Sequence, residues 1–144
     1  MRNNLPPFHL AFPVKNLLET KNFYTKFLGC SLGRSSPEWV DFNFYGHQIT
    51  AHLSPDSCDT VNNQVDGKNV PVRHFGLIME WDDWHLIKNK LIQNKAHFII
   101  DPYIRFKDKP GEQATLFIVD PSFNGIELKA FKEKKMIFAK CFFR

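Results

Sequence analysis

Apolar side chains in the first third of the chain recur first at every second position and then at helical spacing. The even-numbered residues of 8–14 are all apolar, which predicts a strand there. Leucine and aromatic residues then follow at helical spacing, which predicts a helix over residues 16–28 that ends at Gly29. Further apolar stretches predict strands over residues 31–33, 39–45 and 48–53.

The same order of elements returns in the second half of the chain. Apolar residues predict a strand over residues 73–81 and a helix over residues 82–94, with Asp82 as its N-cap and Trp84, Ile87 and Leu91 facing inward. Three more strands are predicted over residues 98–106, 114–120 and 125–131. The chain is thus expected to be an α+β protein of two βαβββ modules, residues 8–53 and 73–131.

Two segments lie outside the modules. Residues 54–72 are polar and contain Pro55, Gly67 and Pro71, which is typical of a linker. Residues 132–144 form a basic and aromatic tail, with Phe138, Phe142 and Phe143, that we expect to pack back on the body.

The alternation of the strands places four polar residues on the side away from the apolar core. In each predicted strand that opens or closes a module, most of the bulky apolar residues share one face. His9, Gln48, His74 and Glu127 occupy the other face, and His52 lies on the same face as Gln48. Two imidazoles and a carboxylate suit a divalent first-row metal ion. Gln48 is a weaker neutral ligand or a contact for the substrate.

Composition narrows the class of protein. The chain has 144 residues, 43% of them hydrophobic, which favours a single packed domain over residues 1–144. Cys30, Cys58 and Cys141 form no Cys-x-x-Cys pair, and we expect free thiols rather than a zinc knuckle or a disulfide framework. The net charge of +4 is scattered, so no nucleic-acid partner is expected. No apolar run nears ~20 residues, and the expected location is cytoplasmic, away from membranes.

Three motifs in order resemble the vicinal oxygen chelate superfamily of glyoxalases, bleomycin- and fosfomycin-resistance proteins and extradiol dioxygenases. They are FHLAFPV at residues 8–14, FYTKFLGC at residues 23–30 and DPSFNGIELKAF at residues 120–131. The third is similar to the signature Asp-Pro-x-Gly-Asn-x-x-Glu, with Phe123 in place of its glycine. Two further stretches, residues 33–53 and 109–121, resemble a bacterial subgroup of predicted extradiol-type dioxygenases.

The resemblance implies a glyoxalase-like fold, in which the modules form a curled mixed sheet with helices outside, and a metal held by His9, His74 and Glu127. It implies Fe(II), with Mn, Ni or Zn as alternatives, and dioxygen-dependent cleavage of a small, catechol-like substrate. His52 and Tyr103 are candidates for proton transfer. Gln48, Arg105 and Gln113 are candidates for contacts with the substrate.

Two other functions stay open at this point. One is a glyoxalase-like lyase or isomerase, or a fosfomycin-type transferase, that uses its metal without dioxygen. The other is a metal-free protein that binds a drug, as in bleomycin resistance. A homodimer is expected because paired copies are the commonest assembly, and the pocket lies within one chain or between two.

Overall fold

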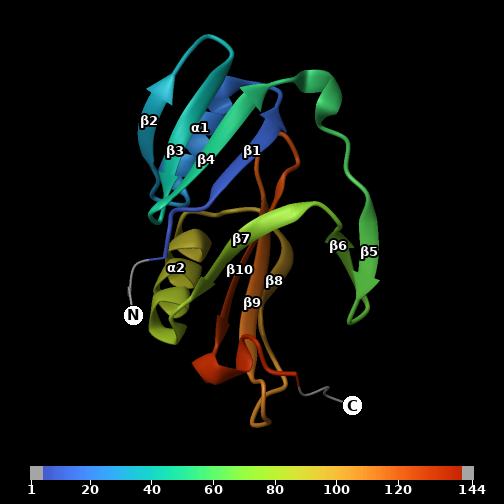
Figure 1. Cartoon of the computed structure of the whole chain (residues 1–144). Helices are drawn as coiled ribbons and strands as arrows, with labels where there is room; N and C mark the ends of the chain where they lie inside the picture. Colours follow the sequence, from blue (N-terminus) through green and yellow to red (C-terminus); the bar gives the residue numbers. More distant parts are fainter. Residues whose placement is uncertain (1–4, 141–144) are drawn as a thin grey trace. The chain divides into compact units, whose positions relative to one another are not determined.

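The computed structural model describes residues 5–140, which form two compact units, each with a mixed four-stranded sheet (Figure 1). Unit 1 comprises Met1–Thr60 and the turn Asp120–Asn124, and unit 2 comprises Val61–Val119 and Gly125–Arg144. Every strand and helix predicted above is present, with ends within two residues of the prediction. The α+β fold of two βαβββ modules is confirmed.

Unit 1 has the strand order β1-β4-β3-β2, in which β1 runs parallel to β4 and the other pairs are antiparallel. Its helix, α1, packs on the face of the sheet that carries the buried side chains of Phe12 and Val14, and the helix buries its own Tyr24 against Phe12. The side chain of Asn16 caps this helix by accepting from the amide of Glu19 at 2.9 Å. The elements are β1 (His9–Val14), α1 (Leu17–Lys26), β2 (Ser31–Ser35), β3 (Trp39–Phe44), β4 (His47–Leu53) and a 3-10 turn, η1 (Pro55–Ser57).

Unit 2 repeats this topology in the order β7-β10-β9-β8, again with the first and last strands of the module parallel. Its helix, α2, buries Trp84, Ile87 and Leu91 as predicted, and the Trp84 indole donates to the Leu128 carbonyl at 2.8 Å. The elements are β5 (Asn62–Val65), β6 (Lys68–Pro71), β7 (His74–Met79), α2 (Trp81–Gln93), β8 (Phe98–Arg105), β9 (Gln113–Val119), β10 (Gly125–Phe131) and η2 (Lys134–Met136).

The start of α2 differs from the prediction. The helix begins at Trp81 after Glu80, and Asp82 is not the N-cap. Asp82 and Asp83 instead lie in the first turn, where a negative charge is favoured by the helix dipole.

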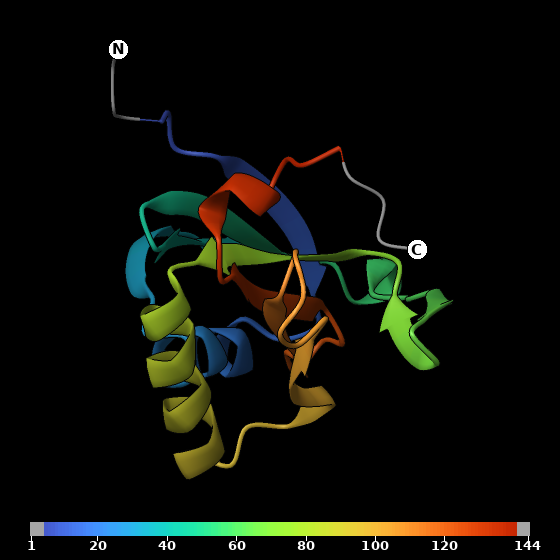
Figure 2. The ribbon, with the colours of Figure 1, turned by 90° about the horizontal axis from the view of Figure 1, so that it is seen from below.

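The stretch predicted as a polar linker contains a β-hairpin. Strands β5 and β6 pair antiparallel around Asp66 and Gly67, which adopt positive φ angles of 51° and 72°. An Asp-Gly pair with this backbone is the preferred two-residue hairpin turn, so the signal was present in the sequence. Figure 2 shows this hairpin and α2 on opposite sides of the sheet of unit 2.

The described part of the tail packs on the body only in part: Met136 and Ile137 are half-buried, and the ammonium groups of Lys132 and Lys134 pair with Glu112 and Glu80. The side chain of Phe138 is 90% exposed, whereas Phe142 and Phe143 lie outside the described residues. Among residues 5–140, no helix is long and apolar enough to cross a membrane.

The turn Asp120–Asn124, which carries the signature motif, is anchored in unit 1 by a buried carboxylate. Asp120 accepts from the Tyr24 hydroxyl at 2.9 Å, from the amides of Ser122 and Asn124, and from the Asn124 side chain. Asn124 also donates to the Pro13 carbonyl at 2.9 Å. Phe123 has a φ of 65°, a left-handed conformation that explains why the signature places a glycine here. The turn therefore forms in this chain even though Phe123 stands where the signature has glycine.

We predict that Tyr24→Phe destabilises the protein and that the loss grows with pH. The hydroxyl hydrogen-bonds to a buried carboxylate, and such a bond contributes about 1.5–3 kcal/mol. Burial raises the pKa of Asp120, and the Tyr24 hydrogen bond opposes that rise. A raised pKa means that the folded state binds the proton more tightly, so stability falls as pH rises through the folded pKa. Without the hydroxyl the pKa rises further, and the deficit is larger at neutral pH than near pH ~4.

Urea unfolding at both pH values measures this effect. Tyr45→Phe, which changes an exposed ring, is the matched control and should show a small loss that does not vary with pH. Equal losses for Tyr24→Phe at both pH values would contradict the role given to the carboxylate.

Candidate functional site

The sheet of unit 2 brings five of the predicted residues to one face. In the register of β8, β9 and β10, Arg105 pairs with Gln113, Tyr103 with Thr115, and Glu127 with Phe117. Residues paired directly across strands point to the same side of a sheet. The residues gathered on this face are His74, Tyr103, Arg105, Gln113 and Glu127.

His74 and Glu127 meet because Gly76 has no side chain. Gly76 lies opposite Glu127 in the parallel pair of β7 and β10. A Cβ atom at Gly76 would lie 1.5 Å from the Glu127 carbonyl oxygen, well inside any tolerable contact. The two strands therefore approach closely at this point, and the His74 ring reaches Glu127, with Nε2 3.3 Å from Oε2.

The orientation of the His74 ring leaves an acceptor facing the carboxylate. Nδ1 lies 2.6 Å from the Pro71 carbonyl oxygen, and a carbonyl only accepts, so Nδ1 must donate. In the neutral ring, Nε2 then carries a lone pair that faces Glu127 Oε2. Two acceptors need a cation between them, which is either a proton or a metal ion. Imidazole nitrogen and carboxylate oxygen are ligands of divalent first-row metals, so this pair fits one.

Neighbouring groups hold the Glu127 carboxylate in this position. The Thr115 hydroxyl donates to Oε1 at 2.8 Å, and the Lys129 ammonium lies 3.8 Å from the same oxygen. The side chains of His74 and Glu127 are 29% and 17% exposed, so both remain reachable from solvent.

Tyr103 and Arg105 bind the turn of the β5–β6 hairpin. Arg105 Nε forms an ion pair with Asp66 Oδ2 at 2.7 Å, although its N–H is not directed at that oxygen and makes no hydrogen bond. The Tyr103 hydroxyl lies 3.5 Å from the same oxygen. Burial raises the pKa of Tyr103, with Arg105 opposing and Asp66 adding to the rise. Tyr103 therefore keeps its proton at neutral pH and acts as a donor.

Gln113 is buried, and its amide lies 3.5 Å from the Gly111 carbonyl oxygen. Its side chain thus supports the loop before β9.

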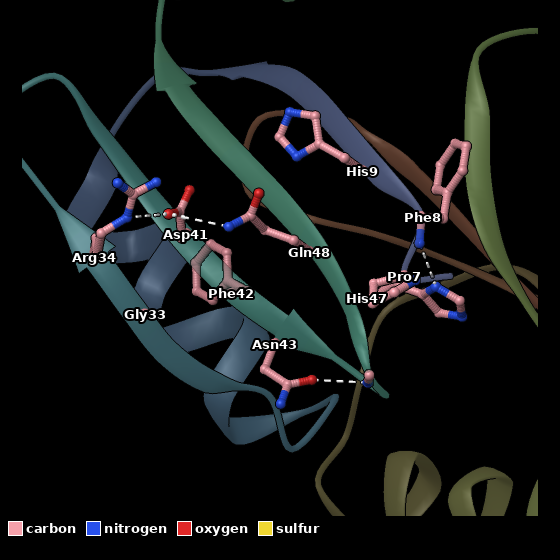
Figure 3. Close-up of a pocket in the computed structure, with 11 residues that line it drawn as sticks. Pro7, Phe8, His9, Gly33, Arg34, Asp41, Phe42, Asn43, His47 and Gln48 are labelled. Carbon is pink, nitrogen blue, oxygen red and sulfur yellow. Dashed lines mark hydrogen bonds and ion pairs between the residues drawn. The ribbon is translucent and has the colours of Figure 1, made fainter. Parts of the chain in front are cut away.

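Unit 1 has its own hollow, of about 540 Å³, on the corresponding face of its sheet (Figure 3). His9 and Gln48 pair directly across β1 and β4 and both line the hollow, as strand alternation predicts. His52 lies further along β4, exposed, between Pro13 and Trp39.

A buried carboxylate orients the Gln48 amide. Asp41 Oδ1 accepts from the Thr50 hydroxyl at 2.7 Å, and Oδ2 lies 3.4 Å from Arg34 Nε and 3.5 Å from Gln48 Nε2. Because a carboxylate only accepts, it selects the amide orientation with nitrogen inward. The Gln48 oxygen is left pointing away from Asp41, into the hollow (Figure 3).

Among the described residues of each unit, no three His, Cys, Asp or Glu side chains lie close enough together to form a metal site. Unit 2 brings together two of the three predicted ligands, and the third, His9, belongs to unit 1.

Comparison with solved structures decides the family. The chain is 33% identical to a glyoxalase/bleomycin resistance protein/dioxygenase from Alicyclobacillus acidocaldarius, with a TM-score of 0.80 over 96% of this chain and 100% of that one. The chain belongs to the glyoxalase/bleomycin resistance/dioxygenase superfamily. The resemblance drawn from the three sequence motifs is confirmed.

Two further solved structures, at lower sequence identity, share the fold. The fosfomycin resistance protein FosX from Listeria monocytogenes has 14% identity and a TM-score of 0.65 over 94% of this chain and 98% of that one. The lactoylglutathione lyase from Agrobacterium tumefaciens has 14% identity and a TM-score of 0.61 over 90% of this chain and 96% of that one. The sequence matches no protein-family model and no curated protein.

Three groups at these sites were not anticipated from the sequence. Asp41 was detectable, because it is an acidic residue within an apolar strand and on the same face as Gln48. Thr115 was detectable only through its register with β10. The Pro71 carbonyl carries no sequence signal, since every residue has one.

We predict that Gly76→Ala is strongly destabilising. The new methyl group would overlap the Glu127 backbone, and overpacking of this kind costs about 1–3 kcal/mol or more. Gly33→Ala is the control, because its Cβ would meet the Asp41 side chain at 3.1 Å rather than backbone. Denaturant unfolding followed by circular dichroism measures both variants. Equal unfolding midpoints for the two would contradict the close approach of β7 and β10.

Proposed function

We propose that this protein is a metal-dependent enzyme acting on a small molecule with two neighbouring oxygen atoms. The observation that supports this most is the His74–Glu127 pair, in which two acceptor atoms face each other at 3.3 Å. His9 is proposed as the third ligand, supplied by the same chain or by a second copy in a homodimer. Membership of the superfamily supports the same reading.

We infer that the reaction is cleavage of a catechol-like substrate with dioxygen. Two histidines and one carboxylate are the donor set of many non-haem Fe(II) oxygenases, with positions left open for substrate and dioxygen. Bound Fe(II) would supply chelation of both substrate oxygens and reactivity toward dioxygen. The name of the relative from Alicyclobacillus acidocaldarius, glyoxalase/bleomycin resistance protein/dioxygenase, includes this class of enzyme and so favours this reaction.

The remaining proposed residues bind substrate or move protons. Gln48 offers its carbonyl oxygen to a substrate hydroxyl, because Asp41 holds the amide nitrogen. His52 is proposed for proton transfer. Tyr103, Arg105 and Gln113 were predicted as catalytic or substrate-binding residues from the sequence. Their contacts with Asp66 and the Gly111 carbonyl favour supporting roles instead.

A second candidate is a lyase, isomerase or transferase that uses Mn, Ni or Zn without dioxygen. A mutant of FosX from Listeria monocytogenes, which shares the fold with a TM-score of 0.65, has been crystallised in complex with Mn(II) and 1S,2S-dihydroxypropylphosphonic acid. That ligand carries neighbouring hydroxyl groups, as the proposed substrate does.

Metal binding is expected to depend on His74 and Glu127. The wild-type protein should bind about one Fe(II) or Mn(II) per chain, measured by titration under anaerobic conditions. His74→Ala and Glu127→Gln should each weaken binding by more than about 100-fold, since loss of a ligand exceeds the ~10–100-fold cost of losing an outer partner. His97→Ala changes an exposed histidine outside the site and is the control.

Unchanged affinity in His74→Ala would overturn the metal site. A protein that binds no divalent metal but still binds an aromatic drug would instead be a sequestering protein.

Oxygen consumption separates the two catalytic candidates. The protein loaded with Fe(II) should consume oxygen when a panel of catechols is added, and Glu127→Gln should not. An oxygen electrode together with the absorbance of the ring-cleaved product measures the reaction. Turnover of a vicinal diol or hemithioacetal by the Mn, Ni or Zn form, without oxygen uptake, would favour the second candidate.

A further inference from the structure

The β5–β6 hairpin packs against the same face of the unit 2 sheet that carries His74 and Glu127. Val70 of β6 is buried in a cluster with Ile100 of β8 and Phe117 of β9. The Phe117 ring in turn meets the His74 ring edge-on, with 5.0 Å between centroids. The hairpin is thus connected by packed side chains to a proposed metal ligand.

Polar contacts hold the hairpin turn on the sheet. Asp66 lies 2.7 Å from Arg105 Nε and 3.5 Å from the Tyr103 hydroxyl. The Lys68 ammonium lies over the Tyr103 ring, 4.9 Å from its centroid. The Arg105 side chain is 25% exposed and that of Asp66 is 46% exposed, so the ion pair is shielded from water and from salt on the Arg105 side only. We call Asp66, Arg105 and Tyr103 the hairpin latch.

The opposite end of the hairpin determines the state of the His74 ring. Pro71 is the last residue of β6, and its carbonyl accepts from His74 Nδ1 at 2.6 Å. The Pro71 ring also packs beside Gly125, where an added Cβ would meet its Cγ at 3.2 Å. A backbone carbonyl bonded to one imidazole nitrogen selects the tautomer and aims the other nitrogen at its ligand.

We propose that the hairpin is a positioning element for His74, and that the latch holds it in place. With the latch closed, the Pro71 carbonyl keeps the proton on Nδ1 and presents the lone pair of Nε2 toward Glu127. Arg105 and Tyr103 are then positioning residues that act through the hairpin. This inference rests on the proposed function only for its effect on metal affinity, since the tautomer is a property of the metal-free protein.

Opening the latch should change the His74 ring and the metal affinity together. Asp66→Ala removes the acceptor shared by Arg105 and Tyr103, and Asp101→Asn, at an exposed carboxylate of β8, is the matched control. In the metal-free protein with a neutral His74 ring, ¹⁵N spectra should show a protonated Nδ1 in wild type and in Asp101→Asn. Asp66→Ala should show a mixture of tautomers and about 10-fold weaker Mn(II) binding by electron paramagnetic resonance.

Rescue distinguishes the latch from a general loss of folding. The double variant with Asp66→Arg and Arg105→Asp restores an ion pair with reversed charges and should recover the single tautomer and at least part of the Mn(II) affinity. A single Nδ1–H tautomer in Asp66→Ala would overturn the proposal, as would identical tautomer mixtures in Asp66→Ala and Asp101→Asn. Absence of Mn(II) binding in wild type would reject the proposed function alone, because the tautomer comparison would still test the hairpin.

Discussion

Parallel pairing of the first and last strand of each module is the constraint on which both polar faces depend. A parallel pair with a two-residue alternation sets which side chains become neighbours. In unit 1 it places His9 beside Gln48, and in unit 2 it places Gly76 beside Glu127. The helix of each module covers the apolar face of its own sheet, so the polar residues collect on the other face.

The two modules use this shared topology for different chemistry. In unit 2 the close approach at Gly76 lets an imidazole meet a carboxylate, which fits a metal ion. In unit 1 the last strand carries Gln48, whose neutral amide is held by the buried Asp41. An oriented amide oxygen is a hydrogen-bond acceptor and a weak ligand. The two modules therefore offer one charged acceptor, the Glu127 carboxylate, and one neutral acceptor, the Gln48 amide oxygen.

Backbone groups contribute to the candidate site as much as side chains do. The Pro71 carbonyl sets the His74 tautomer, and the missing side chain of Gly76 permits the contact with Glu127. The hairpin that supplies Pro71 lies in a stretch whose polar composition is typical of a linker. Its Asp-Gly turn, its buried Val70 and the Asp66–Arg105 ion pair make it an ordered part of unit 2.

The spacing of apolar residues by itself determined the order of strands and helices along the chain. It also determined the strand face on which His9, Gln48, His74 and Glu127 lie. This was possible because side-chain direction in a strand follows from local geometry. The motifs indicated the superfamily, because three of them occur in its order along the chain. Only the tertiary structure decided that Tyr103 and Arg105 bind Asp66, that Asp41 holds Gln48, and that Pro71 holds His74. These contacts depend on strand register and on a hairpin folded over the sheet, which join residues far apart in the chain and leave no periodic trace in the sequence.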